Sequence, residues 1–108
     1  MVDDIRRFDI VLVKLNPTVS SEIQKTRPCI IISPDEMQGL KTVIIAPMTS
    51  KGFNFIFRPH ITFEGTEGLV LLDQIRAVDK TRIVKTIGKV DGKTAQTIAM
   101  MLQEMFRY

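Results

Sequence analysis

The sequence predicts a small, mainly β protein with one C-terminal α-helix, and three observations support this fold class. The chain has 108 residues, which suffice for one hydrophobic core and leave no room for a second. Short runs of β-branched and aliphatic residues recur between proline, glycine and polar turn residues. Near the C-terminus the apolar period becomes helical. This order favours a strongly bent sheet or partly open barrel that the helix covers.

Turn residues separate the predicted strands. The first strand ends at Asn16-Pro17, and the second begins after Pro28. Pro59 puts the fourth strand at an edge or a bulge, because proline cannot donate to a ladder. The predicted strands are residues 8–15, 29–33, 42–48, 54–63 and 69–73, with 75–78 continuing or pairing beside the last and one more short strand within 83–90.

Residues 93–106 are predicted to form an amphipathic helix, with Asp91 as its N-cap. Met100 and Met101 stand beside the apolar stripe, and we expect them to pad the core rather than to contact a partner subunit. Residues 64–68 are predicted as a turn and 79–82 as a helical turn. The stripe itself consists of Ala95, Ile98, Ala99, Leu102, Met105 and Phe106.

Composition excludes several classes of protein. Apolar residues make up 44% and charged residues 25%, as in ordinary globular domains. No apolar run approaches the ~20 residues that span a bilayer. Acidic residues at the N-terminus do not fit a secretory signal, so we expect a cytoplasmic protein. Cys29 and His60 are the only residues of their types, which predicts neither a disulfide nor a metal or other cofactor, and His60 is expected at the surface.

The net charge of +3 permits binding to nucleic acid without requiring it. Most of the excess positive charge falls between Arg76 and Lys93, a segment that contains six basic and two acidic residues. A solvated sheet edge and a track for phosphates explain this segment equally well.

Three polar stretches are candidates for the chemistry. Residues 16–27 form a long polar segment that we interpret as a functional loop, in which Glu22 and Arg27 either pair or face a phosphate together. Residues 47–51 (PMTSK) put two hydroxyls and an amine at a strand end, where such residues often only cap a turn. In residues 72–76 (LDQIR), strand alternation would separate Asp73 and Ile75 from Gln74 and Arg76.

Together these stretches resemble the MazF/PemK family of toxin endoribonucleases. The family motifs match Asn16-Pro17-Thr18, residues 20–28, residues 47–50 and residues 73–79. The order and spacing agree over nearly the whole chain, and the collinear set is more specific than any single motif. The sequence departs from the family pattern at Gln24 and Lys25. Some members of the family use an arginine two residues before the aspartate as the general acid, and here that position is Leu71, so no general acid is carried over.

The resemblance implies a small SH3-like, partly open barrel of the CcdB/MazF type and a homodimer. It also implies metal-independent, sequence-specific cleavage of single-stranded mRNA, inhibited by a cognate antitoxin whose acidic, flexible tail occupies the RNA groove. The essential arginine falls on Arg27, the essential threonine on Thr49, the loop glutamate on Glu22, and an acid used by some members in proton transfer on Asp73.

These side chains suit attack by the ribose 2′-OH on the adjacent phosphorus. Arg27 would neutralise the growing phosphate charge, and Thr49 would donate a hydrogen bond to it. Glu22 would accept the 2′ proton or orient Arg27, and we favour the orienting role. The predicted contacts to RNA are Asn16, Ser21, Ser50, Lys51, Phe53, Gln74 and Arg76.

The aromatic side chains are few, and three of them alternate along the predicted fourth strand. Phe53, Phe55 and Phe57 would therefore share one face, where core packing is the default and Phe53 is the candidate for stacking on a base.

Two other functions stay open at this point. A gyrase poison similar to CcdB would share the barrel, but that class uses a tryptophan near its end and this sequence has none. A catalytically silent RNA-binding barrel would carry the same basic and polar residues without cutting RNA.

Overall fold

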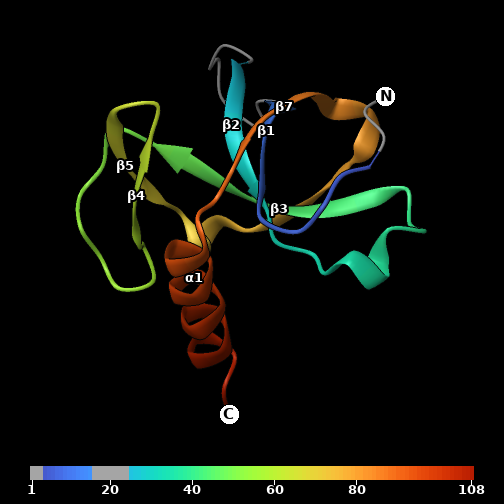
Figure 1. The fold of residues 1–108 in the computed structure, drawn as a ribbon. Helices are drawn as coiled ribbons and strands as arrows, with labels where there is room; N and C mark the ends of the chain where they lie inside the picture. The colour runs from blue at the N-terminus through green and yellow to red at the C-terminus, as the bar shows by residue number, and fades with distance from the viewer. Residues whose placement is uncertain (1–3, 16–24) are drawn as a thin grey trace.

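The computed structural model describes residues 4–15 and 25–108, and that part of the chain forms a bent sheet with one α-helix beside it (Figure 1). The strands are β1 (Asp9–Leu15), β2 (Lys25–Ile31), β3 (Thr42–Thr49), β4 (His60–Phe63), β5 (Thr66–Val70), β6 (Arg76–Asp79) and β7 (Ile83–Lys89). The described residues also form three 3₁₀ turns and the helix: η1 (Asp35–Met37), η2 (Leu72–Gln74), η3 (Lys80–Arg82) and α1 (Gly92–Met105).

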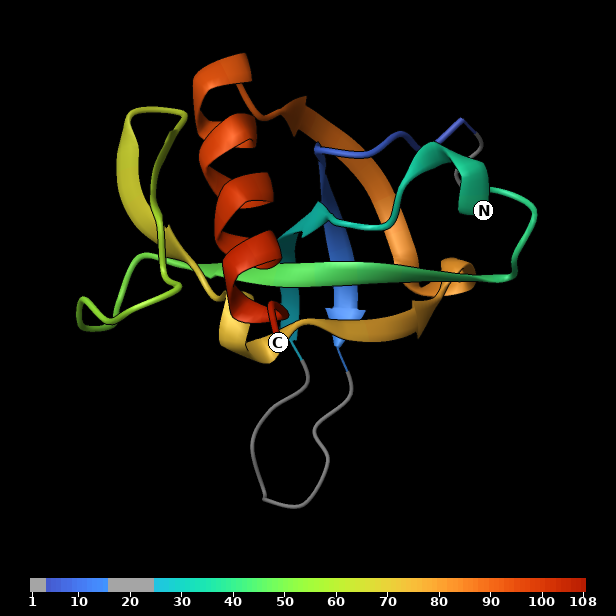
Figure 2. The same ribbon diagram turned by 90° about the horizontal axis from the view of Figure 1, so that it is seen from below.

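β3 is the central strand of the fold. It pairs antiparallel with β6 along its first half, with β2 from Ile45 to Pro47, and with β5 at its end. The strand order is β4-β5-β3-β2-β1-β7, with β6 attached to β3 off this path. Figure 2 shows β3 crossing the molecule between the β4–β5 hairpin and β6. The predicted class, mainly β with a C-terminal helix, is therefore confirmed.

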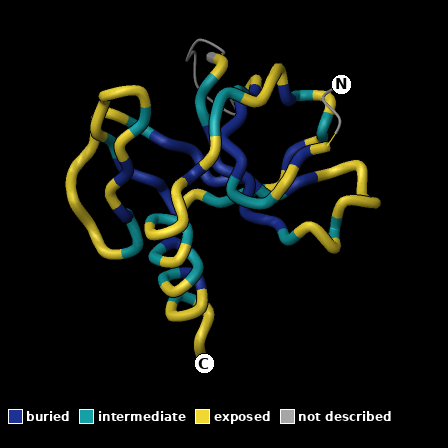
Figure 3. Tube along the Cα trace, viewed as in Figure 1, coloured by how far each residue is buried: buried dark blue, intermediate teal, exposed yellow. Residues whose placement is uncertain are grey.

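Two apolar clusters lie on opposite faces of the central strands. Ile30 belongs to the cluster that packs against α1, whereas its neighbours Cys29 and Ile31 belong to the cluster inside the bent sheet. Successive side chains of a strand point to opposite faces, so both faces of β2 are buried there. This explains why Cys29 to Ile32 is an unbroken apolar run, and Figure 3 shows the buried trace concentrated in these strands.

The predicted C-terminal helix is confirmed to within one residue at each end. The Asp91 side chain accepts a hydrogen bond of 2.8 Å from the Thr94 backbone N–H and caps the helix. Met101 packs against the core, as expected for padding, but Met100 is 67% exposed. Among the described residues, no helix is long and apolar enough to cross a membrane.

The second strand begins earlier than predicted. β2 starts at Lys25, so Arg27 and Pro28 lie in a strand, whereas the sequence assigned Arg27 to a loop. The cause is tertiary: pairing with β1 continues through Val13↔Arg27 to Leu15↔Lys25. Cross-strand pairing overrides the weak local strand preference of these polar residues.

The fourth strand is shorter than predicted, and the expected shared face of three phenylalanines is wrong. Only His60–Phe63 is strand, and Phe53 and Phe55 are exposed in the loop before it. Phe57 adopts a left-handed φ of 65° and packs against the core, which ends the extended alternation at that residue. His60 is exposed at the start of edge strand β4, as predicted.

The fifth strand is displaced towards the N-terminus relative to the prediction. Glu64 and Gly65 both have positive φ and form a two-residue hairpin turn, so β5 already begins at Thr66. The strand ends at Val70, and η2 follows at Leu72–Gln74. Because η2 is a 3₁₀ turn, the alternation predicted for Asp73 and Gln74 does not hold. The predicted helical turn at 79–82 is confirmed by η3.

Candidate functional site

The sheet register brings Arg27 and Thr49 to the same face. The last β2–β3 pair joins Cys29 and Pro47. Arg27 lies two residues from Cys29, and Thr49 lies two residues from Pro47, so alternation puts both side chains on the face of that pair. Continuing the register by two residues would set Arg27 opposite Thr49. The two residues were singled out from separate parts of the sequence, and the fold brings their strands side by side.

Both residues line one cavity of about 570 Å³. Ser50 and Lys51 line it as well, so four of the predicted site residues meet there. The wall includes apolar residues of the sheet and two carboxylates, Glu64 and Glu67, from the β4–β5 hairpin. Arginine, lysine and hydroxyl-bearing residues along one concave surface are residue types suited to binding a phosphodiester.

The Thr49 hydroxyl closes a tight turn at the end of β3. Its Oγ1 accepts a hydrogen bond of 3.1 Å from the Lys51 N–H and donates one of 2.6 Å to the Lys51 carbonyl. The turn sets Ser50 and Lys51 at the rim of the cavity. To donate a hydrogen bond to a ligand instead, the hydroxyl must rotate its O–H away from the Lys51 carbonyl. The position of the oxygen atom does not need to change.

Arg76 lies on the same side of the barrel as Arg27. It pairs with Ile45 of β3 at the start of β6. Burial raises the pKa of the Cys29 thiol to about 12, and the positive charges of Arg27 and Arg76 oppose this increase. Both guanidinium groups are therefore close enough to act on one buried sulfur. The thiol stays protonated at neutral pH and is no nucleophile.

Asp73 is engaged by a residue that the sequence analysis did not select. Arg58 donates from Nε to Oδ1 at 2.9 Å and from Nη2 to Oδ2 at 3.0 Å. These hydrogen bonds hold the pKa of the Asp73 carboxyl below its usual range. Asp73 is therefore ionised at neutral pH and already has a partner for each of its two carboxylate oxygens.

The remaining predicted residues divide into two groups. Asp73, Gln74, Arg76 and Phe53 are described but do not line the 570 Å³ cavity. Asn16, Ser21 and Glu22 lie outside the described residues. Within residues 4–15 and 25–108, no group of three His, Cys, Asp or Glu side chains is arranged to hold a metal ion.

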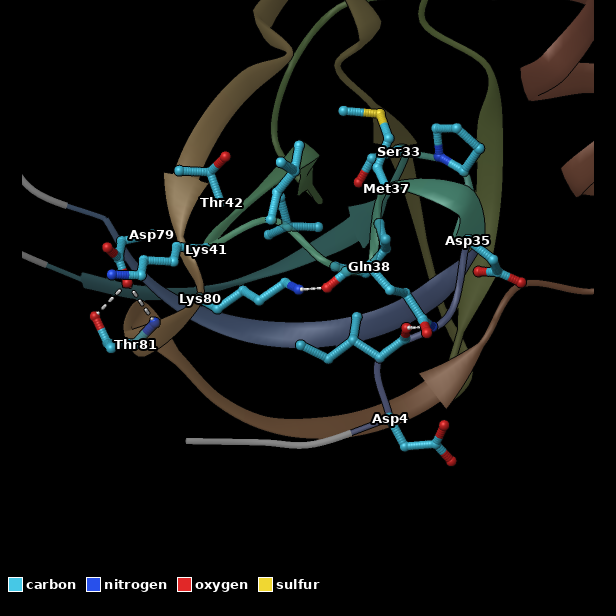
Figure 4. Close-up of a pocket in the computed structure, with 15 residues that line it drawn as sticks. Asp4, Ser33, Asp35, Met37, Gln38, Lys41, Thr42, Asp79, Lys80 and Thr81 are labelled. Carbon is cyan, nitrogen blue, oxygen red and sulfur yellow. Dashed lines mark hydrogen bonds between the residues drawn. The ribbon is translucent and has the colours of Figure 1, made fainter.

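A second cavity, of about 590 Å³, lies elsewhere on the barrel and contains none of the predicted site residues (Figure 4). Hydrogen bonds connect residues of its wall to one another. Lys80 Nζ donates to the Gln38 carbonyl, and Gln38 Nε2 donates to the Ile5 carbonyl, each at 2.6 Å. We assign the candidate site to the first cavity, because that cavity combines Arg27 with the hydroxyl groups of the β3 end.

Three charged residues of this region were missed by the sequence analysis. Glu64 and Glu67 looked like parts of a plain turn, and only the hairpin geometry brings them to the cavity. Arg58 pairs with a residue 15 positions away, and no local pattern indicates that contact.

Gly68 allows β5 to lie against the backbone of Thr49. A Cβ at position 68 would stand 2.6 Å from the Thr49 carbonyl oxygen, which belongs to the central strand and cannot move freely. We expect Gly68→Ala to lower the free energy of unfolding by about 1–3 kcal/mol, as for other overpacked sites, with urea denaturation as the measurement. Gly92→Ala is the matched control, because nothing lies within 4 Å of its added Cβ. Equal urea midpoints for the two variants would contradict the close approach.

Comparisons with known proteins agree with the fold and the motifs. The family described as PemK-like, MazF-like toxins of type II toxin–antitoxin systems matches residues 6–106. Endoribonuclease EndoA of Bacillus subtilis is 26% identical over 106 residues, covering 92% of this chain and 91% of that protein. Endoribonuclease MazF of Staphylococcus saprophyticus is 29% identical over 101 residues, covering 87% and 84%.

Among solved structures, an endoribonuclease from a mycobacterial species, in complex with its cognate antitoxin, has a TM-score of 0.81 to this chain. The likeness covers 97% of this chain and 99% of that one at 16% identity, so it bears on the fold alone.

Proposed function

This chain belongs to the PemK-like, MazF-like toxins of type II toxin–antitoxin systems, and we propose that it is an endoribonuclease that cuts single-stranded mRNA at short sequences without a metal ion. The endoribonuclease activity follows two of its relatives, EndoA of Bacillus subtilis and MazF of Staphylococcus saprophyticus, which carry that name. The observation that carries the proposal is the shared cavity of Arg27 and Thr49.

In the proposed reaction the ribose 2′ oxygen forms a bond to the adjacent phosphorus and the bond from phosphorus to the 5′ oxygen breaks. A base takes the 2′ proton, and an acid supplies a proton to the departing 5′ oxygen. The products are a 2′,3′-cyclic phosphate and a 5′-hydroxyl. Arg27 binds the non-bridging phosphate oxygens, whose negative charge grows in the transition state. Thr49 donates to the same phosphate after its proton leaves the Lys51 carbonyl.

The other predicted residues keep supporting roles in this proposal. Glu22 orients Arg27 or takes the 2′ proton, as the resemblance implies. Asp73 is poorly suited to donating a proton at neutral pH, because Arg58 keeps it ionised. The proposed contacts to bases or backbone remain Asn16, Ser21, Ser50, Lys51, Phe53, Gln74 and Arg76.

We also propose that the protein acts in the cytoplasm as a homodimer and that a cognate antitoxin with an acidic, flexible tail inhibits it. The exposed apolar side chains of Met100 on α1 and Phe106 directly after it support a contact between subunits. The net charge of +3 and the cationic groups at the cavity favour an acidic partner.

The test is incubation of the purified protein with a long single-stranded RNA in excess EDTA. We expect discrete fragments with 2′,3′-cyclic phosphate or 3′-phosphate ends, identified by end-group analysis and sequencing of the cut sites. Thr49→Ser should retain most of the cleavage, and Thr49→Val, which preserves the shape but removes the hydroxyl, should lose it.

The alternatives have distinct outcomes in the same test. RNA binding without fragments would indicate a silent RNA-binding barrel. Gyrase-dependent cleavage of supercoiled DNA, with intact RNA, would indicate a gyrase poison. Fragments that require added Mg²⁺ would overturn the metal-independent mechanism.

A further inference from the structure

The loop between β3 and β4, residues 50–59, exposes apolar side chains to an unusual degree. Phe53 is 67%, Phe55 61% and Ile56 65% exposed. Figures 1 and 2 show this loop beside the β4–β5 hairpin in both views, and Figure 3 shows most of it as an exposed run. A cluster of exposed apolar side chains on a small protein marks a binding surface.

Arg58 fixes this loop to the body of the protein. Its side chain is only 14% exposed, and both of its hydrogen bonds go to the carboxylate of Asp73 in η2. Two parallel N–H to oxygen bonds define the plane of the guanidinium as well as its position. Phe57, directly before Arg58, is held with a left-handed φ of 65°. Non-glycine residues adopt that conformation when their surroundings enforce it, so the loop has a defined shape.

The same guanidinium lies over the ring of Phe53. The Arg58 Cζ stands 5.1 Å from the centroid of that ring, within the range of a cation–π contact. The edge of Phe55 supports the ring from another direction, with 6.0 Å between centroids and an interplanar angle of 80°. Phe53 is therefore held in place by two neighbours while two-thirds of its surface remains in solvent.

Phe53 follows the rim of the candidate cavity closely along the chain. Thr49 and Lys51 line the cavity, and the loop then turns back at Gly52, where an added Cβ would lie 3.5 Å from Thr49 Cγ2. Phe53 is the next residue. A ligand whose phosphate is bound by Arg27 and Thr49 would bring a group adjoining that phosphate towards the loop.

We propose that Arg58 is a positioning residue for the RNA substrate: anchored by Asp73, it holds Phe53 as a platform on which a nucleobase next to the scissile phosphate stacks. This inference rests on the proposed ribonuclease function. A rigid aromatic ring with a free face is the surface on which unpaired bases stack, and a cation behind the ring strengthens the contact. We favour RNA over a protein partner as the occupant because the loop leaves directly from the cavity rim.

The test uses an RNA oligonucleotide designed around a cut site mapped on long RNA. A 2-aminopurine replaces the base beside the scissile phosphate, and a 2′-O-methyl group at the attacking ribose blocks cleavage. Binding to the wild type should quench the 2-aminopurine fluorescence, because the base stacks. Phe53→Leu, Arg58→Gln and Arg58→Lys should lose most of this quenching. On cleavable RNA they should raise KM about tenfold, the order expected for one stacking contact, with kcat changed far less.

Ile56→Ala is the matched control, since Ile56 is similarly exposed in the same loop and is not one of the residues in the hydrogen-bond, cation–π and edge-to-face contacts of Arg58 and Phe53. It should quench and cleave as the wild type does. Urea denaturation checks that each variant is folded, and Phe53→Leu, at an exposed position, keeps the test valid if the Arg58 variants unfold. Wild-type quenching and KM in Phe53→Leu would overturn the stacking platform while the ribonuclease function stands. If the wild type leaves long RNA uncut, the function itself fails and the platform with it.

Discussion

Replacing Arg27 with alanine is expected to lower the rate of RNA cleavage by roughly 10²–10³-fold, the loss typical when one donor to a developing oxyanion is removed. Arg27 is permanently charged and lines the same cavity as Thr49, and the planar fork of a guanidinium matches two oxygens of one phosphate. The loss should fall mainly on kcat, because the charge on the phosphate oxygens grows between the bound substrate and the transition state. Single-turnover cleavage of the mapped oligonucleotide measures it.

Arg27→Lys separates charge from geometry in the same assay. An ammonium keeps the positive charge but offers no paired donors, so this variant should bind RNA nearly as the wild type does and still cut it slowly. Arg82→Ala is the control for general loss of positive charge, because Arg82 lies in η3 and is not among the cavity residues. Cleavage by Arg27→Ala within a factor of a few of the wild type would remove Arg27 from the reaction.

The motifs of the sequence selected four residues, Arg27, Thr49, Ser50 and Lys51, that line one cavity in the fold, and their roles at that cavity stay predictions. Arg27 and Thr49 were selected from separate stretches, and the antiparallel pairing of β2 with β3 is what brings both into the lining of one cavity. Likewise, the apolar period and Asp91 predict α1 almost residue for residue, because a helix is specified by contacts and caps within a few positions.

The loop of residues 50–59 shows why the rest could not be predicted. An alternation of phenylalanine with other residues satisfies the pattern of a half-buried strand. Nothing in the local sequence distinguishes such a strand from the exposed loop that forms here. In the structure this segment is a loop held by two hydrogen bonds from Arg58 to Asp73, which lies 15 residues further along the chain. The left-handed φ of Phe57 also departs from strand geometry. The start of β2 could not be predicted from the local sequence either, because its first residues become strand through pairing with β1.

Shortening Ile98 to alanine is expected to produce the largest loss of stability among single changes in α1. Ile98 is fully buried and belongs to the cluster that joins the helix to Ile30 and Met48 of the sheet. Removing three carbons there forfeits their burial and leaves a cavity that the surrounding strands cannot close, at a cost of about 2–5 kcal/mol in the free energy of unfolding. Because folded domains are stable by only about 5–15 kcal/mol, the urea midpoint should fall substantially.

Met100→Ala in the same helix distinguishes burial from helix propensity. Alanine is a slightly better helix former than either residue, so propensity alone would make both variants at least as stable as the wild type. Met100 is 67% exposed, and its change should move the free energy of unfolding of the isolated subunit by less than about 0.5 kcal/mol. If the proposed homodimer uses this face, Met100→Ala should instead shift the midpoint in a way that depends on protein concentration, whereas the loss in Ile98→Ala persists on dilution. Similar urea midpoints for the two variants at low concentration would show that α1 is not anchored through Ile98.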